Sequence, residues 1–235
     1  MSNHYKNKLL VEGRDDQYVM QNLLRRHGIS CVIPDRPHGT VSDHLTISIE
    51  QQEGFDTLRK KLSRKLKLEN DLERVGIMVD ADDPTDPSVN IRNRWESIKG
   101  VLNRFDNVVL PDDPNPDGTI GSLQRKDGST LVVGIWIMPN NQLPGTLEDF
   151  IKFLVPADKS SLWDRAEHSV DEIPPDERLF RPIDQQKAYL ATWLAWQKRP
   201  GIPLGAAIHQ RYLDANAPQA HKLIEWIRSL FALTS

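Results

Sequence analysis

Residues 75–82 place the tightest constraint on the fold. Four of the five residues from Val75 to Val79 are apolar, and Asp80 and Asp82 follow before Pro84. This pattern is typical of a buried strand that Pro84 shuts off. Because successive strand residues point to opposite faces, we expect Asp80 and Asp82 to share one side. Two neighbouring carboxylates repel each other, which a divalent cation between them would relieve, although strand-end acids can also simply cap the next turn.

Size and composition fit one globular protein. The chain has 235 residues, of which 38% are hydrophobic and 27% are charged. The net charge of -3 gives no overall attraction to nucleic acid, so such a contact would need a local basic patch. The single cysteine, Cys31, rules out an internal disulfide, and no apolar run approaches the roughly 20 residues needed to cross a membrane. We therefore expect a cytoplasmic protein without a membrane segment.

Apolar strand patterns alternate with helical patterns through the first two thirds of the chain. Expected strands cover residues 8–12, 45–49, 75–79 and 131–138, and expected helices cover residues 15–26, 54–67 and 89–102. Asp15 is the expected N-cap of the first helix, and residues 30–44 are expected to be loop. The proline-rich segment 106–130 has no periodicity, so we expect loop there with at most a short strand at 108–110. Successive strand–helix units predict an α/β fold with a mostly parallel sheet flanked by helices.

The last third of the chain is expected to be helical. Helical patterns cover residues 159–168, 185–198 and 219–231, and Thr146 and Asp149 are placed to cap the start of a further helix. We predict an α/β domain over residues 1–155 and a helical extension over residues 156–235. No long polar linker separates them, so the extension is expected to pack on the sheet as part of one structural unit.

Acidic residues follow several of the predicted strands. In a parallel sheet the carboxyl ends of the strands meet at one edge, where ligands bind. Glu12 ends the first strand, Asp16 lies in the next helical turn, and Glu148 begins the helix after the fourth strand. With Asp80 and Asp82 these acids would offer the oxygen ligands that Mg²⁺ or Mn²⁺ prefers, as phosphodiester hydrolysis or phosphoryl transfer requires. Alternatively, Asp16 could only stabilise a helix N-terminus, and Glu148 could only contribute to helix capping.

Two motifs at this edge resemble those of Toprim domains, namely Glu12-Gly13-x-x-Asp16 and Asp80-x-Asp82. Toprim domains occur in topoisomerases, bacterial primases, OLD-type nucleases and small RNA-maturing ribonucleases. The resemblance covers residues 7–150 and implies a Toprim-like fold, with Glu12 as general acid/base or ligand and the two aspartates as metal ligands. Similarity to OLD-type nucleases implies that Asp16 and Glu148 join them. Residues 134–141, 147–150 and 187–205 also resemble a compact Toprim-like bacterial family of unknown function.

The sequence lacks several features of larger Toprim proteins, which excludes some of their functions. The sequence has no Gly-Lys-Ser or Gly-Lys-Thr ATPase loop, no zinc ribbon and no topoisomerase tyrosine context, which argues against a topoisomerase or a full OLD-type protein. We predict a magnesium-dependent nuclease that acts on nucleic acid, alone, with a protein partner or as a homo-oligomer. The alternatives are a non-catalytic Toprim-like binding scaffold, and a phosphatase or nucleotide-sugar enzyme that uses Asp-x-Asp.

A dense basic run covers residues 59–67. On a helix its leucines would face inward, while Lys60, Lys61 and Arg64 would face water. Such a run usually forms a solvated face, but it could also bind a phosphate backbone. Together with Arg14, which is adjacent to the acidic motif, these residues are the candidate nucleic-acid contacts.

Overall fold

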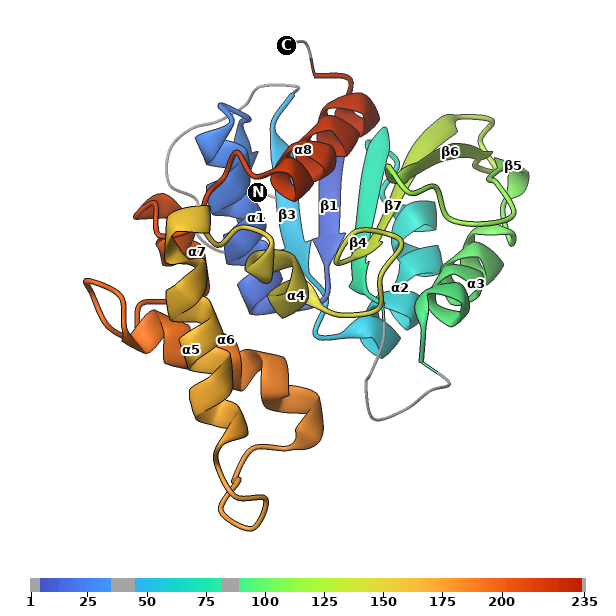
Figure 1. Ribbon diagram of the computed structural model, residues 1–235. Coiled ribbons are helices and arrows are strands. Elements are labelled where there is room, and N and C mark those ends of the chain that lie inside the picture. Colours follow the sequence, from blue (N-terminus) through green and yellow to red (C-terminus); the bar gives the residue numbers. More distant parts are fainter. Residues whose placement is uncertain (1–4, 35–44, 82–88, 234–235) are drawn as a thin grey trace.

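The structure is a computed structural model that describes residues 5–34, 45–81 and 89–233. These residues form a seven-stranded sheet with the order β2-β3-β1-β4-β7-β6-β5 (Figure 1). The strands are β1 (Asn7–Val11), β2 (Cys31–Val32), β3 (Ile47–Gln51), β4 (Arg74–Asp80), β5 (Asp106–Val109), β6 (Thr119–Gln124) and β7 (Thr130–Met138). The neighbours from β2 to β7 in this order are parallel, and β6 and β5 add an antiparallel edge. The predicted α/β fold with a mostly parallel sheet is confirmed.

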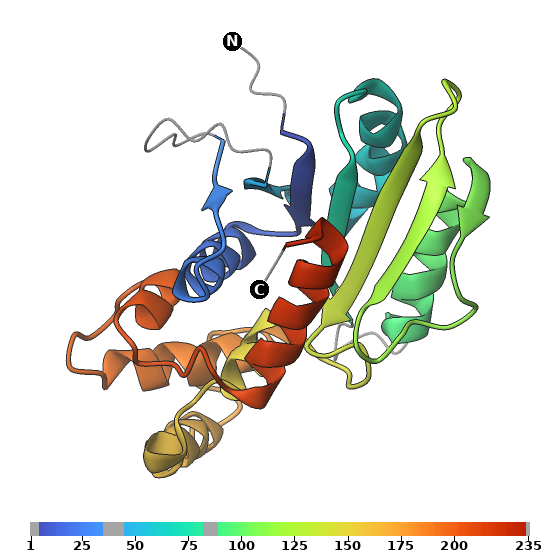
Figure 2. The ribbon, with the colours of Figure 1, turned by 90° about the horizontal axis from the view of Figure 1, so that it is seen from above.

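Helices cover both faces of this sheet. They are α1 (Arg14–Arg26), α2 (Phe55–Leu68), α3 (Ile91–Leu102), α4 (Leu147–Lys152), α5 (Ser160–Asp171), α6 (Gln185–Ala195), α7 (Leu204–His209) and α8 (Pro218–Phe231). Figure 2 shows α1 and α8 on one side of the sheet and α2 and α3 on the other. The predicted helical C-terminal part is present as α5 to α8. None of the helices in the described ranges is long and apolar enough to cross a membrane.

The alternation of side chains along β4 builds two separate cores. Met78 packs into the core formed with α1 and α8, whereas Ile77 and Val79 pack into the core formed with α2 and α3. A strand covered on both faces must be apolar at successive positions, which explains the continuous run in the sequence. The core that contains Met78 also includes Trp163 of α5 and Trp193 of α6. The C-terminal helices therefore share one hydrophobic core with the sheet.

Helix α8 lies against two glycines at the centre of the sheet. Gly76 of β4 and Gly134 of β7 are register partners. A Cβ atom on Gly134 would lie 2.5 Å from Leu230 Cδ2 and 2.9 Å from Trp226 Cζ2. The absence of side chains on these adjacent strand positions therefore makes room for Leu230 and Trp226 of α8.

The structure differs from the sequence predictions at the edge strands. Segment 106–130 was expected to be largely loop, but it contributes β5 and β6, and Cys31–Val32 pairs with β3 inside the expected loop 30–44. These strands are weakly patterned because they are short and β5 is largely exposed, so backbone pairing with a neighbour stabilises them more than burial does. Short helix α7 was also missed, and strand β3 lies two residues later than expected.

Candidate functional site

A cavity of about 330 Å³ lies at the carboxyl edge of β1 and β4. Its lining includes Glu12, Asp16, Asp80 and Glu148, four of the acids predicted to form the site. They follow β1, begin α1, end β4 and begin α4, so four separate segments bring them together. The fifth predicted acid, Asp82, lies outside the described residues.

Backbone amides hold three of these carboxylates in place. Glu12 Oε1 accepts a hydrogen bond from the Asp80 backbone nitrogen at 2.9 Å, and Asp80 Oδ1 accepts one from the Leu147 nitrogen at 3.0 Å. Asp16 Oδ2 accepts one from the Gly13 nitrogen at 3.0 Å. Gly13 and Leu147 belong to the starts of α1 and α4, where amides lack partners within the helix. These amides orient the acids and place partial positive charge beside them.

The start of α1 differs from the prediction. Asp15 was expected to be its N-cap, but Gly13 occupies that position and α1 begins at Arg14. Asp15 is exposed at the rim of the cavity, whereas Asp16 is buried at the third helical position. Helix α1 begins at Arg14 because the Asp16 carboxylate accepts a hydrogen bond from the Gly13 amide. Asp16 therefore both stabilises the start of the helix and lines the cavity.

At α4 the capping prediction is confirmed. The Thr146 nitrogen donates to Asp149 Oδ2 at 2.8 Å, as in a capping box. Thr146 Oγ1 donates to Glu148 Oε2 at 2.7 Å. Because Asp149 satisfies the helix start, Glu148 is available to line the cavity, where it is buried.

Burial raises the pKa values of three acids in the cavity, Glu12, Asp16 and Asp80. Burial raises the pKa of Asp16 to about 7, and the negative charges of Glu12 and Glu148 add to that rise. The pKa of Asp80 lies well above its ordinary range because of burial, with repulsion from Asp16, Glu12 and Glu148 adding to it. Burial also raises the pKa of Glu12, which the hydrogen bond from the Asp80 amide and the charge of Arg94 partly offset. The cluster therefore favours binding of either protons or a cation near neutral pH.

Two cations beside the acids were not found from the sequence. The guanidinium carbon of Arg94 lies 3.9 Å from the centroid of the Phe55 ring, and its charge acts on Glu12. Lys187 of α6 lines the same cavity and lies 3.7 Å from Asp184. Neither residue follows a strand, and although Lys187 begins the family-like stretch 187–205, that resemblance assigned it no role. Their positions depend on how α3 and α6 pack, which no local pattern in the sequence indicates.

The predicted nucleic-acid contacts fall into two groups. Arg14 is exposed and lines the cavity. Lys60, Lys61 and Arg64 are exposed on α2, outside the lining of this cavity. Lys61 Nζ lies 3.6 Å from a carboxylate oxygen of Glu53, so part of its charge is already neutralised.

The donor chemistry of the site suits a hard cation such as Mg²⁺. All four acids offer oxygen, and the raised pKa values of Asp16 and Asp80, caused first by burial and then by neighbouring acids, mark negative charge that a cation would compensate. Within residues 5–34, 45–81 and 89–233, however, no three acidic, histidine or cysteine side chains are arranged so that they could hold one ion. Mg²⁺ needs only one or two carboxylates when water and phosphate supply its other ligands, so the residues fit that mode of binding.

The buried charge of Asp16 predicts an unusual pH dependence of stability without metal. The pKa of this carboxyl rises from its ordinary value of 3.8 to about 7 in the folded protein, which corresponds to at most about 4 kcal/mol. Between these two values the folded state keeps a proton that the unfolded chain has lost. The contribution of Asp16 to the free energy of unfolding therefore falls as pH rises from about 4 to about 7.

Replacing Asp16 by Asn should remove this loss of unfolding free energy at higher pH. In EDTA at pH 8 we expect Asp16→Asn to be more stable than the natural chain by roughly 1–3 kcal/mol, and at pH 4 the gain should largely vanish. Urea unfolding at both pH values measures the difference. The exposed neighbour Asp15 supplies the matched control, Asp15→Asn, which should show no such pH-dependent gain. An equal gain at both pH values would contradict a charge effect at Asp16.

Comparisons with known proteins place the chain in a family. Residues 6–232 match the sequence profile of the family described as a protein of unknown function (DUF3226), so the chain belongs to that family. No curated protein matches the chain. Its fold is similar to the crystal structure of a hypothetical protein from Pyrococcus horikoshii OT3, with a TM-score of 0.50 and 16% identity over 95% of this chain and 94% of that one. At this identity the likeness concerns the fold alone.

Proposed function

We propose that this protein is a Toprim-like nuclease that uses Mg²⁺ or Mn²⁺ to hydrolyse phosphodiester bonds in nucleic acid. The observation that carries the proposal is the convergence of Glu12, Asp16, Asp80 and Glu148 in one cavity at the carboxyl edge of the sheet. Gathering four acids in one cavity, with Asp16 and Glu148 buried and Glu12 and Asp80 half-buried, is costly without a compensating cation. The arrangement is also the one that the resemblance to Toprim domains and OLD-type nucleases implies for these positions.

The metal would be held by carboxylates from different strands. Glu12 and Asp80 are the central candidates because an amide links their two strand ends, and Asp16 and Glu148 flank them. Asp82 remains a predicted ligand outside the described residues. When bound, the metal would neutralise phosphate charge and make water a better nucleophile.

Side chains in and around the cavity are suited to proton transfer and to binding of the substrate phosphate. Burial raises the pKa of Glu12 above its ordinary value, which favours a role for this carboxyl as the general acid or base. Arg94 lies close enough for its charge to favour the ionised form of Glu12. Arg14 and Lys187 line the same cavity and can bind phosphate oxygens of the substrate. Acids for the metal and cations for the phosphate thus border one space.

Cleavage assays with a panel of substrates test this function. Labelled single-stranded DNA, duplex DNA and single-stranded RNA are incubated with the natural chain in Mg²⁺, Mn²⁺ or EDTA. We expect cleavage of at least one substrate with Mg²⁺ or Mn²⁺ and none in EDTA. Hydrolysis of p-nitrophenyl phosphate with no cleavage of nucleic acid would favour the phosphatase alternative. If millimolar metal neither supports cleavage nor raises the thermal midpoint, the binding-scaffold alternative replaces the proposal.

A further inference from the structure

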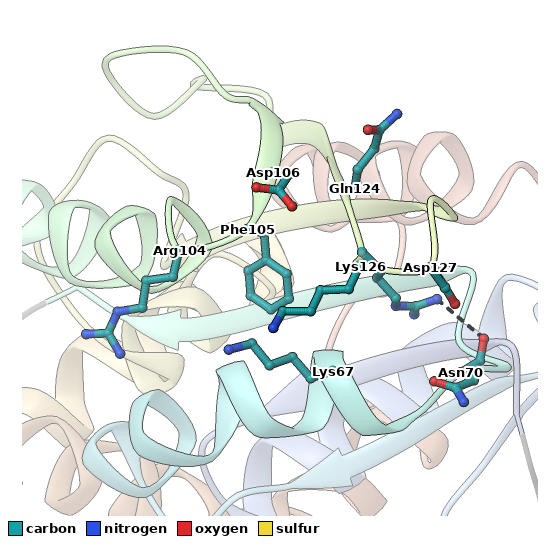
Figure 3. Close-up of a pocket in the computed structure, with 9 residues that line it drawn as sticks. Lys67, Asn70, Arg104, Phe105, Asp106, Gln124, Lys126 and Asp127 are labelled. Carbon is teal, nitrogen blue, oxygen red and sulfur yellow. Dashed lines mark hydrogen bonds between the residues drawn. The ribbon is translucent and has the colours of Figure 1, made fainter.

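A second cavity, of about 400 Å³, lies at the opposite end of the sheet from the acidic site. It is bounded by the last turn of α2, the residues after α3 and the turn between β6 and β7 (Figure 3). Lys67, Phe105 and Lys126 line it, one from each of these segments. Its volume falls in the range of small-ligand sites, which is roughly 300–1,000 Å³.

The cavity combines an aromatic ring with cations. Lys67 Nζ lies 5.6 Å from the centroid of the Phe105 ring. In Figure 3 the side chains of Lys67 and Lys126 both extend toward this ring, whereas Arg104 extends away from it. Within the part of the chain that the structure describes, Lys67 and Lys126 form no ion pair. Asp106 and Asp127 line the same cavity but form no ion pair with these lysines in the described ranges, so the lysine charges are available to an anionic ligand.

A buried arginine fixes the back of the cavity. Arg125 is 7% exposed, and its Nε donates to the Leu66 carbonyl oxygen at 3.0 Å. Its Nη2 donates to the carbonyl oxygen of Leu72, so one side chain ties the α2–β4 connection to the end of β6. These bonds join the segments that carry Lys67 and Lys126, and the pairing of Asp106 with Gln124 joins the segment of Phe105 to them, without a ligand. Such preorganisation lowers the entropic cost of binding.

We propose that this cavity binds one nucleotide of a single-stranded nucleic acid, with the base stacked on Phe105 and the phosphate between Lys67 and Lys126. A nucleotide matches the cavity because it carries both a planar ring and a negative charge. Stacking on aromatic rings beside a basic groove is how proteins bind single strands without reading their sequence. The choice of a strand over a free nucleotide rests on the proposed function.

Helix α2 connects this cavity with the acidic site. Gly54, which precedes α2, lines the acidic cavity, and Lys67 in its last turn lines the second one. Lys60, Arg64 and Lys67 follow one another at helical spacing on the face opposite the buried leucines. The distance along the helix is about 20 Å, which corresponds to roughly six nucleotides at 3.4 Å each. A strand held at Phe105 can therefore reach the acids along this basic stripe.

Fluorescence anisotropy in EDTA tests the proposal without cleavage. The probe is fluorescein-labelled dT12, and the variants are Phe105→Leu and the double variant Lys67→Gln/Lys126→Gln. We expect Phe105→Leu to weaken binding roughly tenfold. The double variant should weaken binding and lower the salt dependence of log K by about 0.7, because the contact with one phosphate is lost. Lys198→Gln, an exposed lysine of the C-terminal part, is the control and should leave binding unchanged.

Further binding measurements distinguish a single strand from a free nucleotide as the ligand. A labelled dT4 should bind more weakly than dT12, because it cannot span α2, and free dTMP should compete poorly. Binding of dT12 that neither set of variants weakens would overturn the proposal, as would equal affinity for dTMP and dT12. The lysine variants keep the test valid if Phe105→Leu unfolds. Because binding is measured without metal, a protein that binds dT12 here but cleaves nothing would refute only the nuclease function.

Discussion

Replacing Asp80 by Asn is expected to lower metal-dependent cleavage at least about a hundredfold. The pKa of Asp80 lies well above its ordinary range, with burial as the main cause and three neighbouring acids adding to it. Asn keeps an oxygen that can accept the hydrogen bond from the Leu147 amide, so α4 should stay in place. It removes the negative charge that would hold the metal. The rate constant for cleavage at saturating Mg²⁺, measured on the preferred substrate, gives the effect.

The same variant should be at least as stable as the natural chain in EDTA. Removing a buried charge from a cluster of like charges relieves repulsion. A stable but inactive Asp80→Asn therefore separates a chemical role from a structural one. The control is Asp164→Asn, which makes the same change at an exposed acid of α5 and should keep full activity. Cleavage that persists in Asp80→Asn would show that the activity does not depend on this site.

Replacing Trp226 by Ala is expected to cost about 3–5 kcal/mol of unfolding free energy. Trp226 is 2% exposed, lies against Gly134 and contacts Trp136, with ring centroids 5.6 Å apart. Its Nε1 also donates to the Thr119 carbonyl oxygen at 3.1 Å, which would lose this partner. Because Gly134 has no side chain to fill the space, the cavity would stay open.

Thermal or urea unfolding measures this loss, which corresponds to a fall in midpoint of roughly 6–20 °C for a chain of this size. Trp196 offers a matched control because it is 40% exposed at the end of α6. Trp196→Ala should cost far less, within about 1 kcal/mol. Equal losses in the two variants would contradict the packing of α8 against the central strands.

The central strands and the acidic edge could be predicted because each carries a local signal. The β4 run is apolar at successive positions since both faces are covered, and Asp80 follows it directly. Chain order and the parallel arrangement then place Glu12 at the same edge. The hairpin β5–β6 could not be predicted in this way, because its stability depends on pairing with β7 rather than on its own pattern.

Side chains that enter the site from distant helices carry no such signal. Arg94 and Lys187 sit on ordinary helical segments, and only the packing of α3 and α6 brings them to the acids. The second cavity was missed for the same reason. Lys67 was part of the basic run in the sequence, but its neighbours Phe105 and Lys126 come from segments about 40 and 60 residues away, and no periodicity links them.

The packing of α8 against Gly76 and Gly134 has a consequence for the synthesis of the protein. The strands β4 and β7 are complete once Met138 has been synthesised, yet the helix that covers their middle spans Pro218–Phe231. A ribosome-bound chain would expose an apolar groove over paired glycines for the time needed to make some 80 more residues, which is about 4–16 s at typical elongation rates. Chaperones that shield nascent apolar surface would therefore find a binding surface here, and folding would finish only after α8 emerges.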